Sequence, residues 1–268
     1  MGFWEIVLFI CPMLFLAGMI DGISGGGGII SLPTYLIAGI PINAAYGCNK
    51  LQSFLGTSAS LAKYAKCGLV DWKPALIACC GAILGANGST YVMMHLDEGV
   101  KTWIIIGAMC FIITLMFLTC KLHFTDSGIQ KLPSNKKHAV QCIGLGLLLG
   151  MYDGFFGPGC GTVALILFSV IFKYDMHVAV GNGKIIIVVS NLIALISYTR
   201  SGDILYAVAL PASAANIIGS YIGASLAVKK GKKTGVSDAD FGNSHPVDTD
   251  TFEIDMKNWS PCYESDTD

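Results

Sequence analysis

Charged residues are scarce in this chain of 268 residues, at 13% against roughly 25% in soluble domains. Arginine is nearly absent, because Arg200 is the single arginine among 17 basic residues. Without a basic face the chain is not a nucleic-acid-binding protein. The residues AVILMFWYC make up 53% of the chain, and the mean hydropathy is +0.63. These values also exclude a soluble globular domain.

Motifs of enzymatic and metal chemistry are missing as well. The sequence holds no Walker A, Rossmann, H-E-x-x-H or G-x-S-x-G motif, and no nucleophile–base pair stands out. The ten cysteines form no C-x-x-C pair and lie mostly in apolar runs, where cysteine behaves as a small hydrophobic residue. We therefore expect no enzymatic activity, no ATP-driven transport within the chain, no disulfide framework, no metal and no other cofactor.

Hydrophobic segments dominate what is present. A membrane helix needs about 20 predominantly apolar residues. The clear candidates are 3–20, 75–95, 101–120, 139–157, 159–174 and 204–228. Weaker candidates, interrupted by Gly, Pro, Asn or Lys, are 29–46, 51–66 and 179–199. We predict an all-α polytopic membrane protein with about 7–9 membrane segments, several of them short, broken or tilted.

An internal repeat organises these segments. Residues 18–27 read G-M-I-D-G-I-S-G-G-G, and residues 150–159 read G-M-Y-D-G-F-F-G-P-G, an offset of 132. The match resumes at an offset of 134, where A-Y-G-C-N-K at 45–50 meets A-V-G-N-G-K at 179–184. Two Gly-rich apolar stretches can resemble each other by chance, but Asp and Lys recurring at matched positions favour duplication. Internal repeats are typical of secondary transporters.

The hydrophobic segments and the charges together divide the chain into four parts. These are a first membrane repeat (1–120), a basic loop (121–138), a second membrane repeat that lacks a closing hydrophobic segment (139–233) and an acidic tail (234–268). Residues 1–233 carry 16 basic and 9 acidic side chains, a net of +7, whereas the tail carries 1 and 9, a net of −8. The tail has few apolar residues, so we expect it to be disordered.

Lysines in short loops predict the orientation in the membrane. Lysines cluster in 121–137 and in 229–233, which should both be cytoplasmic by the positive-inside rule. The acidic tail would follow on the cytoplasmic side. The segment count then places the N-terminus outside, so the first repeat enters from outside and the second from inside. We therefore predict two inverted repeats, with Arg200 as an exception on the outer side.

Each repeat opens with a helix that runs into glycines. Gly22 and the run Gly25–Gly28 cannot all be comfortable in one helix interior, where each costs about 1 kcal/mol relative to Ala. Gly157-Pro158-Gly159 is the matching break in the second repeat. A helix that restarts at membrane depth presents free N–H groups to an anion, although small residues also allow close helix packing. The pairing of the two breaks favours a binding site.

Four ionisable residues recur at matched positions beside these breaks: Asp21, Asp153, Lys50 and Lys184. Such groups cost at least ~2.5 kcal/mol each at membrane depth and usually face the interior of the bundle. The lysines could bind an anion while the aspartates pair or carry protons. Alternatively, each Asp could cap the broken helix and each Lys close a buried pair, for which we expect Asp21 with Lys50. The neighbouring amides could bind substrate or satisfy the backbone. The candidate substrate-binding residues are Asp21, Gly25, Gly26, Gly27, Asn49, Lys50, Asp153, Gly157, Gly159, Asn182 and Lys184.

The sequence resembles the TauE/SafE family of sulfite exporter-like permeases in three features. These are the doubled D-G-x-x-G-x-G opening, the A-x-G-x-x-K that follows it, and the G-L-V-D-W step at 68–72. The resemblance covers about residues 5–233. It implies a transporter that moves small anions, often sulfur-containing ones such as sulfite or sulfonates, across the plasma membrane. Family members normally continue with a further hydrophobic segment where this chain passes from Lys233 into the acidic tail.

From the residues and the resemblance together we expect a multi-pass membrane permease for secondary transport of a small anion. The expected partners are the anionic substrate and the lipid bilayer; nucleic acid is not among them, and the sequence indicates no oligomeric state. The alternative is a protein that uses the same scaffold without transporting, either a receptor or partner subunit or an inactive truncated paralogue.

Overall fold

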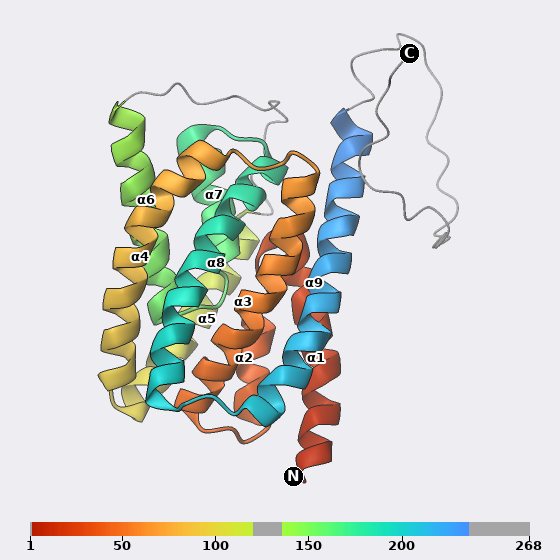
Figure 1. Cartoon of the computed structure of the whole chain (residues 1–268), viewed down its shortest axis with the longest axis vertical. Coiled ribbons are helices and arrows are strands. Elements are labelled where there is room, and N and C mark those ends of the chain that lie inside the picture. The colour runs from red at the N-terminus through yellow and green to blue at the C-terminus, as the bar shows by residue number, and fades with distance from the viewer. Residues whose placement is uncertain (1, 120–135, 236–268) are drawn as a thin grey trace.

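The computed structural model describes residues 2–119 and 136–235, and these residues form nine α-helices and no β-strand (Figure 1). The first half contains α1 (Phe3–Ser24), α2 (Gly28–Ile37), α3 (Ile42–Lys66), α4 (Trp72–His95) and α5 (Glu98–Thr119). The second half contains α6 (Lys136–Phe155), α7 (Cys160–Phe172), α8 (Met176–Ser201) and α9 (Tyr206–Gly235). The predicted all-α class is confirmed.

The helix boundaries repeat with the sequence. The first residues of α3 and α8 are 134 positions apart, and so are those of α4 and α9. The loops after α3 and α8 contain Gly68 and Gly202, which both adopt the left-handed backbone that ends helices, with φ of 72° and 78°. Thus α1–α4 correspond to α6–α9. Within the described residues, α5 has no counterpart.

The two repeats enter the bundle from opposite ends. Figure 1 shows the N-terminus at one end, with α2 returning toward that end, whereas α6 begins at the opposite end and α7 returns toward it. The start of α3 therefore lies beside the loop between α8 and α9, where Gly47 contacts Asp203. In the same way the start of α8 lies beside the loop between α3 and α4, where Gly181 contacts Leu69. The predicted inversion of the repeats is confirmed.

The repeats are interlocked rather than side by side. The most extensive helix contacts are between α4 and α6 and between α1 and α9, each joining one repeat to the other. Glycines make this possible, because a Cβ on Gly146 would collide with the backbone of Ala78, and one on Gly223 with that of Met19. Small residues allow such close approach of helices in lipid, where the hydrophobic effect does not drive helices together.

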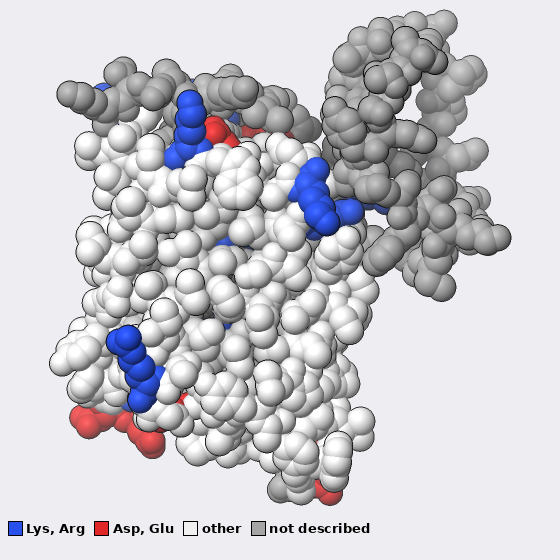
Figure 2. Space-filling model, in the orientation of Figure 1, with Lys and Arg blue, Asp and Glu red and all other residues white. Residues whose placement is uncertain are grey.

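The outer surface fits a bilayer. Five of the described helices are long and apolar enough to cross a membrane: α1, α4, α5, α8 and α9. The helices α2 and α7 are apolar but shorter. Figure 2 shows charged side chains gathered at the two ends of the molecule, with a largely uncharged band between them. The chain is a multi-pass membrane protein.

Some expected boundaries differ from the structure. Residues 136–138 belong to α6 and not to the basic loop, and α9 extends to Gly235, past the expected end of the second repeat. The rest of that loop and the predicted disordered tail from 236 onward lie outside the described residues. The start of α6 and the end of α9 lie at the same end of the molecule, opposite the N-terminus, as predicted (Figure 1). That this end is cytoplasmic stays a prediction.

One cysteine also departs from expectation. The sequence predicts no disulfide framework, yet Cys67, at the end of α3, is disulfide-bonded. The free cysteines among the described residues include Cys48, Cys142 and Cys160, which are buried as expected for small hydrophobic side chains.

Candidate functional site

The two glycine breaks meet each other inside the bundle. Helix α1 ends at Gly25, whose φ of 79° is left-handed, and α7 begins after Gly159, whose φ is 75°. Gly25 lies backbone to backbone against Gly161, so that a Cβ on either residue would collide with the other. Gly28, the first residue of α2, lies in the same way against Pro158. The predicted breaks are present, and they form one shared structure.

Each break is held by a lysine from the opposite repeat. Lys50 of α3 donates to the backbone oxygen of Asp153 at 2.6 Å, and its Nζ lies 2.9 Å from the carboxylate of that residue. Lys184 of α8 donates to the backbone oxygen of Asp21 at 2.7 Å, with the Asp21 carboxylate at 3.7 Å. A cation is favourable at the C-terminal end of a helix such as α1 or α6. The expected pairing of Asp21 with Lys50 is wrong, because the inverted entry of α1 and α6 brings each Asp to the Lys of the other repeat.

The two pairs differ in closeness and burial. The Asp153 carboxylate also accepts a hydrogen bond from Ser190 at 2.7 Å, and its side chain is 3% exposed. The Asp21 carboxylate accepts one from Thr57 at 3.1 Å, and its side chain is 17% exposed. Both lysines are fully buried. The Lys50–Asp153 pair is therefore closer and more buried than the Lys184–Asp21 pair.

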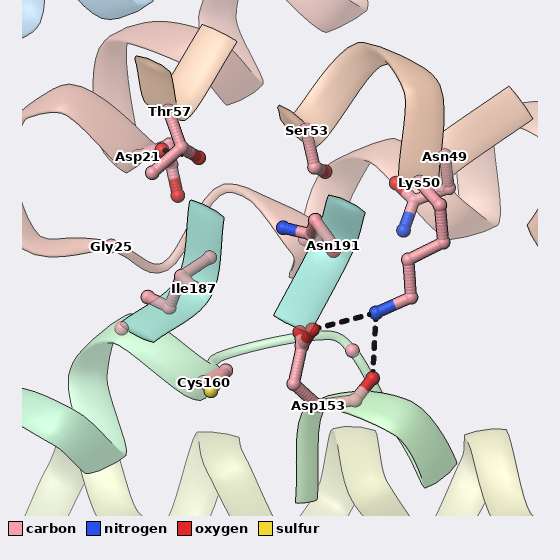
Figure 3. A pocket seen from close by; sticks show the side chains of 13 residues that line it. Asp21, Gly25, Asn49, Lys50, Ser53, Thr57, Asp153, Cys160, Ile187 and Asn191 are labelled. Carbon is pink, nitrogen blue, oxygen red and sulfur yellow. Dashed lines mark hydrogen bonds and ion pairs between the residues drawn. The ribbon is translucent and has the colours of Figure 1, made fainter. Parts of the chain in front are cut away.

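A small cavity lies between the breaks and the middle turns of α3 and α8 (Figure 3). It is lined by Asp21, Gly25, Gly28, Asn49, Lys50, Ser53, Thr57, Asp153, Gly157, Cys160, Gly161, Ile187 and Asn191. The cavity has a volume of about 20 Å³, which is room for roughly one water molecule. In Figure 3 the ammonium group of Lys50 points to Asp153, with Ser53 and Asn191 nearby. The Lys50–Asp153 ion pair forms part of the cavity wall.

The structure brings six of the candidate residues to this cavity and places five outside it. Those on its wall are Asp21, Gly25, Asn49, Lys50, Asp153 and Gly157. Those outside its lining are Gly26, Gly27, Gly159, Asn182 and Lys184. Gly27 and Gly159 are the residues that precede α2 and α7, and Gly26 lies between Gly25 and Gly27 in the first break.

Asn182 accepts a hydrogen bond from a loop backbone and does not line the cavity. Its side-chain oxygen accepts a hydrogen bond from the backbone N–H of Asp71 at 2.8 Å, in the loop between α3 and α4. The Asp71 carboxylate accepts another from the Tyr174 hydroxyl at 2.7 Å. Burial raises the pKa of Tyr174, and this hydrogen bond to a carboxylate raises it further. Asn182 therefore belongs to a packed corner at the end of the bundle.

Sequence reasoning missed the residues that follow the lysines along the two central helices. Ser53 and Thr57 lie three and seven positions after Lys50, on the same face of α3. Ile187 and Asn191 lie three and seven positions after Lys184, so they match Ser53 and Thr57 at the offset of 134. Helical spacing combined with the repeat offset is the signal that could have found them. The list of candidate residues also lacked three residues at the starts of α2 and α7: Gly28, Cys160 and Gly161.

The chemistry available here is binding by charge and hydrogen bonds. Among the described residues no group of three or more His, Cys, Asp or Glu side chains is placed to hold a metal ion. The four buried charges from Asp21, Asp153, Lys50 and Lys184 sum to zero. The first residues of α2 and α7 bring two helix N-termini to the cavity wall, beside a lysine, two hydroxyls and two amides.

Comparison with known proteins agrees with this architecture. The family described as Sulfite exporter TauE/SafE matches residues 10–236 of the chain. A probable membrane transporter protein of Sinorhizobium is 32% identical over 235 residues, covering 86% of this chain and 86% of that protein. Another from Haemophilus influenzae is 28% identical, covering 81% of this chain and 84% of that protein.

A third similar protein, the probable membrane transporter protein YfcA of Escherichia coli, is 27% identical and covers 85% of this chain and 82% of its own. No solved structure matches the chain. The family match spans both glycine breaks, both lysines, most of α1 and all of α2 to α9. The chain belongs to the TauE/SafE family of membrane transporters.

Proposed function

We propose that the protein is a secondary transporter of a small anion across the plasma membrane, and that the anion binds in the cavity between the two glycine breaks. The observation that carries the proposal is the position of Lys50. Its side chain is fully buried and lies on the cavity wall, which also includes the first residues of α2 and α7. A buried lysine at a cavity between inverted repeats, with two helix N-termini beside it, is suited to an anionic group.

The other polar groups of the wall suit an oxyanion. Ser53 and Thr57 supply hydroxyls, and Asn49 and Asn191 supply side-chain amides. Sulfite, sulfate and sulfonate groups carry several oxygen acceptors around one sulfur atom, so several donors around one point can bind them together with the lysine. The family description names sulfite, and we extend this substrate class, sulfur-containing oxyanions, to the present chain.

The small size of the cavity implies a movement. It has room for roughly one water molecule, so an oxyanion can enter only after the wall opens or after Asp153 leaves Lys50. In inverted-repeat transporters, access alternates when one repeat or bundle moves against the other around a fixed site. The breaks meet at Gly25 and Gly161, between the repeats, where such a movement would change the cavity most directly.

Purified protein in detergent tests the binding step. Its thermal stability is measured with sulfite, sulfate, thiosulfate, sulfonates and carboxylates, because a ligand that binds only the folded state raises the melting temperature by mass action. Uptake of the stabilising anion is then measured in proteoliposomes. If no anion stabilises the protein or enters the vesicles, the proposed function is wrong and the scaffold acts as a receptor or an inactive paralogue.

A matched pair of variants tests the site itself. Lys50→Met combined with Asp153→Asn removes both charges of the pair together, so the double variant should fold. It should bind the anion about 10- to 150-fold more weakly, since hydrogen bonds to charged groups contribute about 1.5–3 kcal/mol. The control is Lys101→Met. Lys101 is also buried, but it bonds Asn43 and the Met94 carbonyl, away from the cavity. Equal affinity in the double variant and the control would contradict the assigned site.

A further inference from the structure

The charges on the cavity wall do not balance. Of the residues that line it, Lys50 is positive while Asp21 and Asp153 are negative, which leaves a net charge of −1. Lys184 neutralises Asp21 from outside the cavity, at 3.7 Å from its carboxylate. An anion bound beside Lys50 would therefore face two carboxylates and would add a negative charge to a buried cluster that sums to zero. A buried charge without a partner is strongly unfavourable.

A proton on one of the two carboxylates removes the imbalance. Neutralising one Asp gives the cluster of four charges a net charge of +1, and an anion in the cavity then balances it. The cluster sums to zero in both states, with or without substrate. Binding of the anion and of the proton would thus favour each other, as thermodynamic linkage requires.

Asp21 is the carboxylate that suits this role. Its ion pair is the longer one, at 3.7 Å against 2.9 Å for Lys50 and Asp153. Its side chain is 17% exposed, against 3% for Asp153, so it is the more accessible of the two carboxylates. If Asp21 becomes neutral, Lys184 keeps its 2.7 Å hydrogen bond to the Asp21 backbone oxygen and its position over the Tyr64 ring, 5.7 Å from the ring centre.

The other titratable groups near Asp21 are already engaged. Tyr64 of α3 donates its hydroxyl to the Gly22 carbonyl at 3.2 Å. Cys160 of α7 directs its thiol to the Leu149 carbonyl at 3.7 Å. Lys184 approaches from α8, and Lys50 and Asp153 share the cavity wall. Of the two carboxylates, Asp21 has the greater exposure and the longer ion pair.

We propose that Asp21 binds one proton with each transported anion, so that transport is coupled to protons. This inference rests on the proposed function of the same site. The proton passes from water on the side of uptake to a carboxylate oxygen of Asp21 and returns to water on the other side when the anion leaves. Asp21 is restored at the end of the cycle, and one proton moves in the same direction as each anion.

The experiment follows protons and anions together in proteoliposomes. The vesicles contain a pH-sensitive dye, and the anion is methanesulfonate, which is monovalent and takes up no proton between about pH 5.5 and 8.5. We expect its addition to acidify the vesicle interior, with one proton per anion. Binding to purified protein should weaken about tenfold per pH unit above the pH at which Asp21 loses its proton, because one proton is linked to each anion.

Two variants locate the proton. Asp21→Asn mimics the protonated state, so its anion binding should be independent of pH and its anion movement should carry no protons. Asp203→Asn removes a carboxylate in the loop between α8 and α9, outside the cavity lining, and as the control should keep the pH dependence of binding. If Asp21→Asn does not fold, Asp21→Asn with Lys184→Met removes both charges of the pair and is expected to show the same loss of proton movement.

Each outcome distinguishes the two proposals. Anion uptake by the wild-type protein without acidification and without pH dependence would overturn proton coupling and leave the proposed function standing. Uptake that requires sodium ions and moves no protons would do the same. Proton movement that survives in Asp21→Asn would overturn the assignment to Asp21. Absence of anion binding and uptake under all conditions would overturn both proposals.

Discussion

The two repeats carry the same Asp, the same Lys and the same glycine break at matched positions, yet they build unequal halves of one site. In the second repeat Asp153 is 3% exposed and lies 2.9 Å from its lysine, whereas in the first repeat Asp21 is 17% exposed and lies 3.7 Å from its lysine. Duplicated residues therefore do not guarantee duplicated environments. The difference depends on what surrounds each break.

Helix α5 contacts one of the two breaks. Ile112 of α5 packs directly on Gly159, where a Cβ would lie 2.6 Å from its Cδ1 atom, so α5 covers the break between α6 and α7. Within residues 2–119 and 136–235 no helix corresponds to α5 in the second repeat. The break between α1 and α2 accordingly has no matching cover among the described residues. Asp21, beside this break, is the more exposed of the two carboxylates.

The largest expected effect distinguishes the two breaks by their glycines. Gly25 and Gly157 both have left-handed φ, of 79° and 74°, so alanine at either position is strained by about 1–3 kcal/mol. Gly25→Ala would also collide with the Gly161 backbone, which adds about 1–3 kcal/mol, whereas a Cβ on Gly157 meets nothing closer than 3.7 Å. We expect a total loss of about 2–6 kcal/mol for Gly25→Ala, measured as folded yield and melting temperature in detergent.

The control for this prediction is Gly88→Ala on α4, where a Cβ meets nothing within 4 Å. It should leave yield and melting temperature unchanged or slightly higher, because alanine favours helix. Equal losses for Gly25→Ala and Gly157→Ala would show that the contact between the breaks is looser than described.

The next effect separates the two lysines. Lys50→Met leaves Asp153 buried and charged, which typically costs about 3–5 kcal/mol. Lys184→Met leaves Asp21, which keeps its hydrogen bond from Thr57 and some contact with water, so we expect about 1–3 kcal/mol. Melting temperatures of the two variants in the same detergent check the order. The reverse order would mean that the exposure of Asp21 does not lower the cost of its charge.

A smaller effect tests which charges pair. Lys50→Met with Asp153→Asn removes a pair that crosses between the repeats and should recover about 1–3 kcal/mol relative to Lys50→Met alone. Lys50→Met with Asp21→Asn combines one charge from each of two different pairs and should recover nothing. A double-mutant cycle on folded yield and melting temperature provides the measurement. Recovery by the second combination would contradict the pairing between repeats.

The smallest effect concerns the corners of the bundle, where the repeats use different residues at the same position. Asn182 accepts a hydrogen bond from the Asp71 N–H at 2.8 Å, and its match Cys48 directs a thiol to the Leu205 carbonyl at 3.8 Å. Asn182→Cys should cost about 1–2 kcal/mol, because it leaves a buried N–H with a weak acceptor. Cys48→Ser, which keeps a donor in place, should change the melting temperature little. A neutral result for Asn182→Cys would show that water serves this N–H.

Much of the fold could be predicted because its signals are local. Hydropathy indicated the helices, glycine runs indicated the breaks, the doubled motif indicated the duplication, and the lysine-rich loops with the segment count indicated that the repeats are inverted. Part of the cavity followed from the same motif, since Asp21, Lys50 and Asp153 line it. The face of α3 that carries Ser53 and Thr57 was not predicted. Serine and threonine in a helix do not by themselves show which face points inward, and this became clear only once the position of Lys50 was known.

The sequence by itself determined the membrane class, the duplication and the residues that would be buried with charge, because these depend on composition and on spacing along the chain. The tertiary structure decided which charges meet. Helices α1 and α6 enter from opposite ends and stop where their breaks touch, so Lys50 reaches Asp153 and Lys184 reaches Asp21. It also decided that the two pairs are unequal, because burial depends on neighbours such as α5 that lie far away in the sequence.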